Sequence, residues 1–132
     1  MSEQQEAGFR ILNIIILESE FKREAVIDFQ HQIDNNFALN TNSVKHDDSN
    51  NYSVYLKAEL KGTQGDRTEF FISVWMVGMF EKFGQPEFSD EQFTSINAPA
   101  IIFPFVREHI ASLAIKGGIG AILLPPVNFL KK

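Results

Sequence analysis

The fold is decided by residues 52–81, which read YSVYLKAELKGTQGDRTEFFISVWMVGMFE. At the start of this stretch every second residue from Tyr52 to Leu60 is apolar, and the residues between them are mostly polar. A period of two is typical of a strand with one buried face. Residues 62–67, with Gly65-Asp66 among them, then predict a hairpin loop.

The strand after this loop, expected over 68–81, is apolar on both faces. One face carries Phe70, Ile72, Val74, Met76 and Phe80. The other carries Phe71, Trp75, Val77 and Met79, interrupted only by Glu69 and Ser73. A strand with two apolar faces is covered on both sides.

A second strand with two apolar faces is expected over 9–22. Strict alternation places Phe9, Ile11, Ile15, Leu17 and Phe21 on one face and Leu12, Ile14 and Ile16 on the other. Residues 23–36 show no such period and predict a crossover with a turn of helix, followed by a more polar strand over 37–46. Together the four strands predict an antiparallel meander, with the first strand brought in by the crossover.

The last third of the chain predicts helix and then irregular structure. Ser89 is expected to cap a first helix, and Asn97 to cap a second that contains Pro104 and stops at Gly117-Gly118. The apolar, Gly- and Pro-containing residues 119–129 fit no regular element. We therefore expect one α+β domain over 1–132, a four-stranded antiparallel sheet with helices packed on one face, after a disordered lead over 1–7.

Composition excludes several functional classes. The 132 residues carry a formal net charge of −5, which disfavours a nucleic-acid binder or docking on anionic lipid. There is no cysteine, so disulfides, thiolate metal sites and Cys nucleophiles are excluded. The polar N-terminus is not that of a signal peptide, and the apolar runs are shorter than a membrane span requires. We expect a cytoplasmic protein without direct membrane insertion.

The sequence shows no catalytic constellation. The histidines His31, His46 and His109 belong to different expected elements, and none has a partner at metal-ligand spacing. The carboxylates Glu18, Glu20, Asp47 and Asp48 stand near strand ends or turns, where solvated charge is the ordinary state. The glycines of 117–120 follow a helix instead of preceding one, so they do not form a phosphate loop. We expect no enzyme activity, no metal and no cofactor.

Surplus apolar surface is the feature that points to function. One helix can shield only one face of the sheet, so the second apolar faces of the long strands are expected to contact another subunit. The candidate interface residues are Ile14, Ile16, Phe71 and Trp75. The crossover and the apolar residues 119–129 suit a groove that binds unfolded polypeptide chain.

From Asn97 onward the sequence resembles the SecB export chaperones. The blocks that match the family pattern are FPFVRE at 103–108 and PVNF at 126–129, and the spacing between them is unbroken. The resemblance implies an ATP-independent holdase that keeps precursor proteins unfolded and passes them to the SecA motor. It also implies a tetramer, built as a dimer of dimers.

The resemblance further implies the site residues. By position, Phe29, Ile33 and Phe37 would line one side of a client groove and Ile119, Ile122 and Leu124 the other. Glu18 fits the acidic patch that receives SecA on the exposed sheet face, but Lys22 and Ser73 stand where further acidic residues are expected.

Two alternatives stay open beside the export chaperone. Family members often continue beyond the PVNF block into a second helix and a tail that binds SecA, whereas this sequence ends at Lys132. The difference, with the thin acidic patch, suits a SecB-like chaperone dedicated to a single partner such as an antitoxin. A non-chaperone oligomer that binds a small molecule would use the same sheet.

Overall fold

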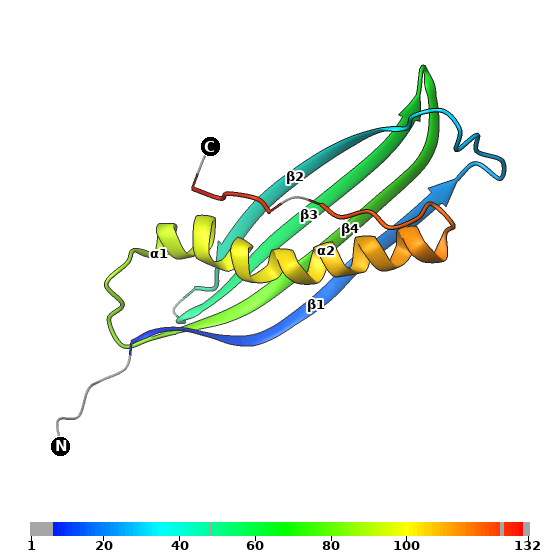
Figure 1. Cartoon of the computed structure of the whole chain (residues 1–132). Helices are drawn as coiled ribbons and strands as arrows, with labels where there is room; N and C mark the ends of the chain where they lie inside the picture. The colour runs from blue at the N-terminus through cyan, green and yellow to red at the C-terminus, as the bar shows by residue number, and fades with distance from the viewer. Residues whose placement is uncertain (1–6, 48, 125, 131–132) are drawn as a thin grey trace.

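A computed structural model of the chain describes residues 7–47, 49–124 and 126–130. Its strands are β1 (Gly8–Arg23), β2 (Asp34–Lys45), β3 (Asn51–Gln64) and β4 (Arg67–Phe83). They form one antiparallel sheet in the order β1-β4-β3-β2 (Figure 1). A helical segment follows, made of α1 (Asp90–Gln92), a π-helical turn η1 (Phe93–Asn97) and α2 (Ala98–Lys116). The predicted fold class is confirmed. The lead expected over 1–7 falls, apart from Ala7, outside the described residues.

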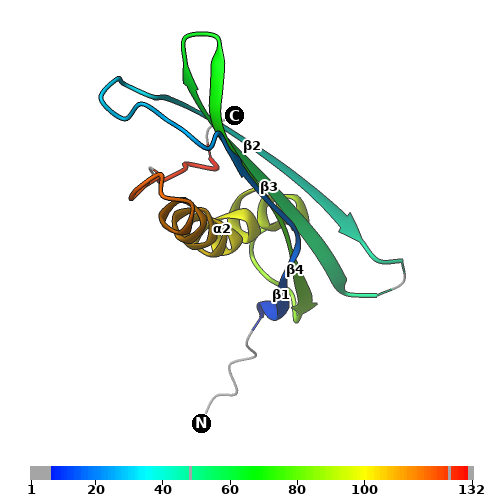
Figure 2. The same ribbon diagram turned by 90° about the vertical axis from the view of Figure 1, so that its right-hand side faces the viewer.

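The helical segment covers one face of the sheet. The alternate residues of β3 from Tyr52 to Leu60 are all at most 3% exposed, as their periodicity predicts. They and the matching face of β4 pack against Ile102, Val106 and Ile110 of α2, which are fully buried. Figure 2 shows α2 along this face, while the opposite face, here called the outer face, carries no element of the described chain.

The hairpin between β3 and β4 is tighter than the sequence suggests. The strands continue to Gln64 and Arg67, so the turn is Gly65-Asp66 alone, and Gly65 adopts a positive φ of 59°. Such a two-residue turn matches the twist of the paired strands. The loop predicted over 62–67 is therefore mostly strand, because Gly62 lies in the ladder with the Phe70 ring filling the space of its missing side chain.

The strict alternation predicted for β1 is wrong. Its pairing with β4 shifts register at Leu12 and again at Leu17, where β1 holds an extra residue. Each such bulge reverses the faces of the residues beyond it. Paired residues share a face, so Ile14 and Ile16 lie on the helix-covered side and Ile15 lies on the outer face.

The helical segment begins after Ser89, as the sequence predicts, but no separate second helix begins at Asn97. The Ser89 hydroxyl accepts a hydrogen bond from the Gln92 amide at 3.0 Å, which confirms the cap. Asn97 has helical backbone angles and makes no side-chain cap, so the second cap is wrong. The wider turn η1 carries the helix through to Pro99, which lacks the amide hydrogen a helix would use.

The result is one continuous helical segment, Asp90–Lys116, of 27 residues. By length and composition it would suffice to cross a membrane, and it is longer than the apolar runs visible in the sequence. Its buried residues pack against the sheet, which is the behaviour of a core helix.

A polar contact fixes the start of this segment to the sheet. The buried Tyr52 donates its hydroxyl to Asp90 at 2.5 Å, and the Lys82 ammonium lies 2.9 Å from the same carboxylate. These two donors hold the pKa of Asp90 below its usual range. Burial and the bond to Asp90 raise the pKa of Tyr52 to about 12.

Candidate client-binding cleft

The crossover between β1 and β2 is an ordered loop with no helical turn over 24–33, contrary to the prediction. Residues at the β3–β4 turn hold its backbone. Gln64 donates its side-chain amide to the carbonyls of Asp28 at 2.7 Å and His31 at 3.1 Å, and Arg67 donates to the Val26 carbonyl at 2.9 Å. These bonds present the loop at one end of the sheet.

The loop also carries its own turn. The Asp28 carboxylate accepts hydrogen bonds from the Gln30 amide at 2.9 Å and from His31 at 2.7 Å. These donors, the backbone one foremost, lower the pKa of Asp28. The turn leaves the Phe29 side chain 52% exposed.

The chain leaves α2 close to the same loop. Gly117 and Gly118 end the helix as predicted, and Gly118 has a positive φ of 71°. Arg23 donates to the Gly117 carbonyl at 2.6 Å, and its guanidinium carbon lies 5.9 Å from the Phe29 ring centroid. Arg23 thus connects the end of the helix to the crossover.

A cleft of about 310 Å³ lies between the crossover and the segment after α2. The structure brings together four of the predicted groove residues here, Phe29 and Ile33 from one side and Ile119 and Ile122 from the other. The remaining lining residues are His31, Gln32, Asn35, Phe70 and Ala121. No regular element is assigned to the described part of 119–129, as predicted. The cleft is open and its lining is mixed, with six apolar residues beside the polar His31, Gln32 and Asn35.

The other two predicted groove residues do not line this cleft. Phe37 points to α2, where its ring meets Phe103 with 6.4 Å between centroids, and Phe103 in turn meets Phe129 at 6.1 Å. Leu124 is only 4% exposed and belongs to the core, while its neighbour Leu123 is 86% exposed. Sequence reasoning missed Leu123, because an irregular segment has no period that tells which side chain faces out.

The outer face carries a different surface. Cross-strand pairing sets Lys22, Phe71 and Lys61 in one row. Two rows further along, Glu18 and Lys57 flank Trp75, which is 37% exposed. The outer face is therefore aromatic along β4 and of mixed charge at its sides.

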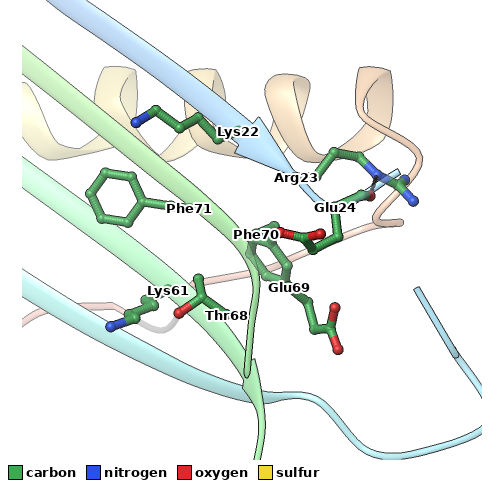
Figure 3. A pocket seen from close by; sticks show the side chains of 8 residues that line it. All are labelled: Lys22, Arg23, Glu24, Lys61, Thr68, Glu69, Phe70 and Phe71. Atoms are coloured by element: carbon green, nitrogen blue, oxygen red, sulfur yellow. Dashed lines mark hydrogen bonds between the residues drawn. The ribbon is translucent and has the colours of Figure 1, made fainter. Parts of the chain in front are cut away.

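A larger hollow of about 470 Å³ lies at the end of this face (Figure 3). Its lining is mostly charged or polar and includes the buried Glu69, whose carboxylate lies 3.0 Å from Arg67. Figure 3 shows the Lys22 and Lys61 side chains on either side of the Phe71 ring. Five of its eight lining residues are charged, whereas six of the nine that line the smaller cleft are apolar, so the smaller cleft is the better candidate for an apolar client.

A third surface lies along β1 and α2. Its exposed apolar side chains are Ile11, Ile16 and Leu17 of β1 and Phe105 of α2, each between 42% and 52% exposed, whereas Leu12 lines a separate cleft with Ser53 and Met79. Ile14, a predicted interface residue, instead packs against the core.

The described residues hold no catalytic or metal-binding cluster. No group of three or more His, Asp or Glu side chains in 7–47, 49–124 and 126–130 is arranged to bind a metal ion. The three histidines are apart, and each has its own partner: Asp28 for His31, Ser53 for His46 and Ser19 for His109. Asp48, one of the carboxylates considered above, lies outside the described residues.

Comparison with known proteins agrees with this reading. The family model of SecB, preprotein translocase subunit SecB, matches residues 2–131. The protein-export protein SecB of Saccharophagus degradans is 35% identical over 127 residues, covering 93% of this chain and 75% of that protein. The SecB of Hahella chejuensis is 33% identical over 136 residues, covering 98% and 85%.

Among solved structures, the chain is similar to the SecB-like chaperone of Mycobacterium tuberculosis, solved in complex with a ChAD peptide from an antitoxin. The TM-score is 0.78, with 91% of each chain covered and 10% sequence identity. This likeness supports the fold, and the sequence matches support the family. The chain belongs to the SecB family of protein-export chaperones.

Proposed function

We propose that this chain acts as a holdase, without nucleotide, by holding unfolded precursor segments in the cleft formed by Phe29, Ile33, Ile119 and Ile122. The observation that carries the proposal is the half-exposed Phe29 ring, which lines the cleft beside Ile33, Ile119 and Ile122 and sits in a loop held by polar contacts. Apolar contacts are non-directional, so such a cleft accepts many sequences. The proposal places the protein in the cytoplasm, as its family membership supports.

The test is the substitution Phe29→Ser, assayed by binding of an unfolded secretory precursor and by suppression of its aggregation without ATP; Phe37 is left unchanged because it packs against the core and does not line the cleft. Burial of the exposed half of one phenylalanine contributes about 1 kcal/mol, so Phe29→Ser alone should weaken binding about fivefold. Phe29 is largely outside the core, so this variant should keep its stability.

Val26→Ser is the matched control. Val26 lies in the same loop and is 78% exposed, but it does not line the cleft. It should bind clients like the unmodified protein. Equal binding by Phe29→Ser, Val26→Ser and the unmodified protein would show that the cleft is assigned wrongly.

The proposal includes an oligomer, a dimer or a tetramer. The exposed apolar side chains along β1 and α2 support this, since a water-exposed surface of this kind is ordinarily covered. Of the predicted interface residues, Ile16 lies on that surface, and Phe71 and Trp75 lie on the outer face. Sedimentation velocity decides the matter, and a monomer at micromolar concentration would contradict it.

The finer question is the partner that receives the client. Delivery to SecA would use Glu18 on the outer face. The row of Lys22, Phe71 and Lys61 on the same face favours a second candidate, a chaperone dedicated to one partner such as an antitoxin. Affinity capture from cells separates the two: many precursors and SecA support the first, and one dominant protein supports the second.

A further inference from the structure

A further cleft, of about 340 Å³, lies on the outer face near the turn between β2 and β3 and is here called the outer cleft. Ser53 of β3 and Met79 of β4 pair across the sheet, and both line it. The other lining residues are Leu12, His46, Asn51, Tyr52, Tyr55 and Phe80. This lining contains no acidic residue, lysine or arginine, unlike the mostly charged hollow near the β3–β4 turn. An uncharged lining favours an uncharged ligand, because a charged one would lose its hydration without gaining a partner.

A bulge in β1 brings Leu12 to the outer cleft. Leu12 is the extra residue between Ile11, which pairs with Phe80, and Asn13, which pairs with Met79. A bulge can turn a side chain toward a place that regular pairing would not reach. The Leu12 side chain is 51% exposed, so half of an apolar group is available to a ligand at this place.

The outer cleft also contains a pair of hydrogen-bonding side chains. The hydroxyl oxygen of Ser53 lies 2.8 Å from Nε2 of His46, and Ser53 is only 5% exposed. A hydroxyl can donate one hydrogen bond and accept two, so the bond to His46 does not use the full capacity of Ser53. The pair therefore offers a fixed polar contact inside a lining that is otherwise largely apolar.

Aromatic and thioether groups complete the lining. Tyr55 lines the outer cleft, and its ring centroid lies 6.0 Å from that of Trp75, the next aromatic residue along the outer face. Aromatic rings and methionine sulfur both make favourable contacts with a further aromatic ring. A cavity of about 150 Å³ is sufficient to hold benzene, so the outer cleft has room for one substituted ring.

We propose that the outer cleft binds one small, uncharged aromatic group that carries a hydrogen-bonding atom, such as a phenol. The ring lies against Leu12, Met79 and Tyr55, and its hydroxyl bonds to the pair of Ser53 and His46. This site is separate from the client-binding cleft and does not rest on the proposed function. The same chemistry is present in a free phenol and in a tyrosine side chain, and the test distinguishes these two sources.

The probe is p-cresol, with toluene as the matched compound that lacks the hydroxyl group. Binding is followed by NMR on protein labelled at the methionine methyl groups. Met79 lines the outer cleft, whereas Met76 lies in the core on the helix-covered face, so one signal reports on the site and the other is an internal reference. We expect p-cresol to shift the Met79 signal until the site is saturated and to leave the Met76 signal unchanged.

Leu12→Ala and Ile11→Ala are a matched pair of variants. The two residues are neighbours and each is 51% exposed, but only Leu12 lines the outer cleft. Leu12→Ala should weaken binding of p-cresol about fivefold, as expected for the lost burial of half a leucine, and Ile11→Ala should leave it unchanged. Ser53→Ala combined with His46→Ala should weaken binding of p-cresol about fivefold, the effect of one hydrogen bond, and leave binding of toluene largely unchanged.

N-acetyltyrosinamide distinguishes the two sources of the ring. Binding as tight as that of p-cresol supports a tyrosine side chain, and much weaker binding supports a free phenol. The proposal is overturned if neither compound shifts the Met79 signal, if the Met79 and Met76 signals shift alike, or if Leu12→Ala and Ile11→Ala lose equal affinity. Phe29→Ser should bind p-cresol like the unmodified protein, so failure of this site leaves the proposed function untouched.

Discussion

Gly117→Ala should destabilise the protein by crowding one aromatic ring. A methyl group at Gly117 would lie 2.0 Å from Cζ of Phe21, on β1, and its other near neighbours are atoms of the same ring. Ordinary van der Waals contact begins at 3.4 Å, so the ring must retreat by about 1.4 Å. Gly117 has a φ of −83°, so the substitution itself strains no backbone angle.

The loss of stability depends on whether the Phe21 ring can move away from the new methyl group. Phe21 is partly buried and packs against the core, so it cannot simply turn into solvent. Overpacking of this kind costs about 1–3 kcal/mol. Alanine is otherwise favoured over glycine next to a helix end, by up to about 1 kcal/mol, so a net loss of about 1–2 kcal/mol is expected.

The assay is a double-mutant cycle followed by urea unfolding. Phe21→Ala alone removes packing, and Gly117→Ala in that background should cost nothing or stabilise, since the clash is gone. A Gly117→Ala variant that is as stable as the unmodified protein, or whose cost persists without the Phe21 ring, would refute the steric argument. Because Gly117 leads into Ile119 of the cleft, the same variant should bind clients more weakly.

Two further predictions concern polar contacts. Asp90→Asn should lower the free energy of unfolding by about 1 kcal/mol at neutral pH, a value below that of a buried charged bond because the carboxylate is partly exposed. The lowered pKa of Asp90 makes this contribution complete above the ordinary value of 3.8 and lost as the pH falls through the folded-state pKa, so urea midpoints of the two proteins should converge in acid. Arg67→Ala should cost about 2 kcal/mol, since it leaves the carboxylate of Glu69, 3% exposed, without its ion pair. Lower protease resistance of the crossover would report the lost bond to the Val26 carbonyl, and Glu69→Gln with Arg67→Ala should recover part of the stability.

Sequence patterns predicted most of the sheet because its strands follow one rule, burial of alternate residues. The burial of alternate residues from Tyr52 to Leu60 and of the helix-covered face of β4 is confirmed. The rule failed in β1 at Leu12 and Leu17, because a bulge is a feature of pairing with β4 and leaves the apolar composition unchanged. A different rule, the preference for Asn at a helix N-cap, failed at Asn97, because the backbone there stays helical.

The candidate cleft was also predicted only in part. Phe29, Ile33, Ile119 and Ile122 were placed together from a resemblance to the family, and the structure brings them to one cleft. Leu124 lies in the core instead, since an irregular segment is oriented only by what it packs against.

By itself, the sequence determined the sheet, the helix that covers it, the family and an excess of apolar surface, because periodicity and composition are properties of the chain alone. Only the tertiary structure decided which side of β1 each isoleucine faces and how the crossover is held. These depend on pairs of residues far apart in the chain, such as Gln64 with Asp28 and Arg23 with Gly117. The periodicity of the sequence does not reveal such contacts, because they form only when the strands and loops pack together.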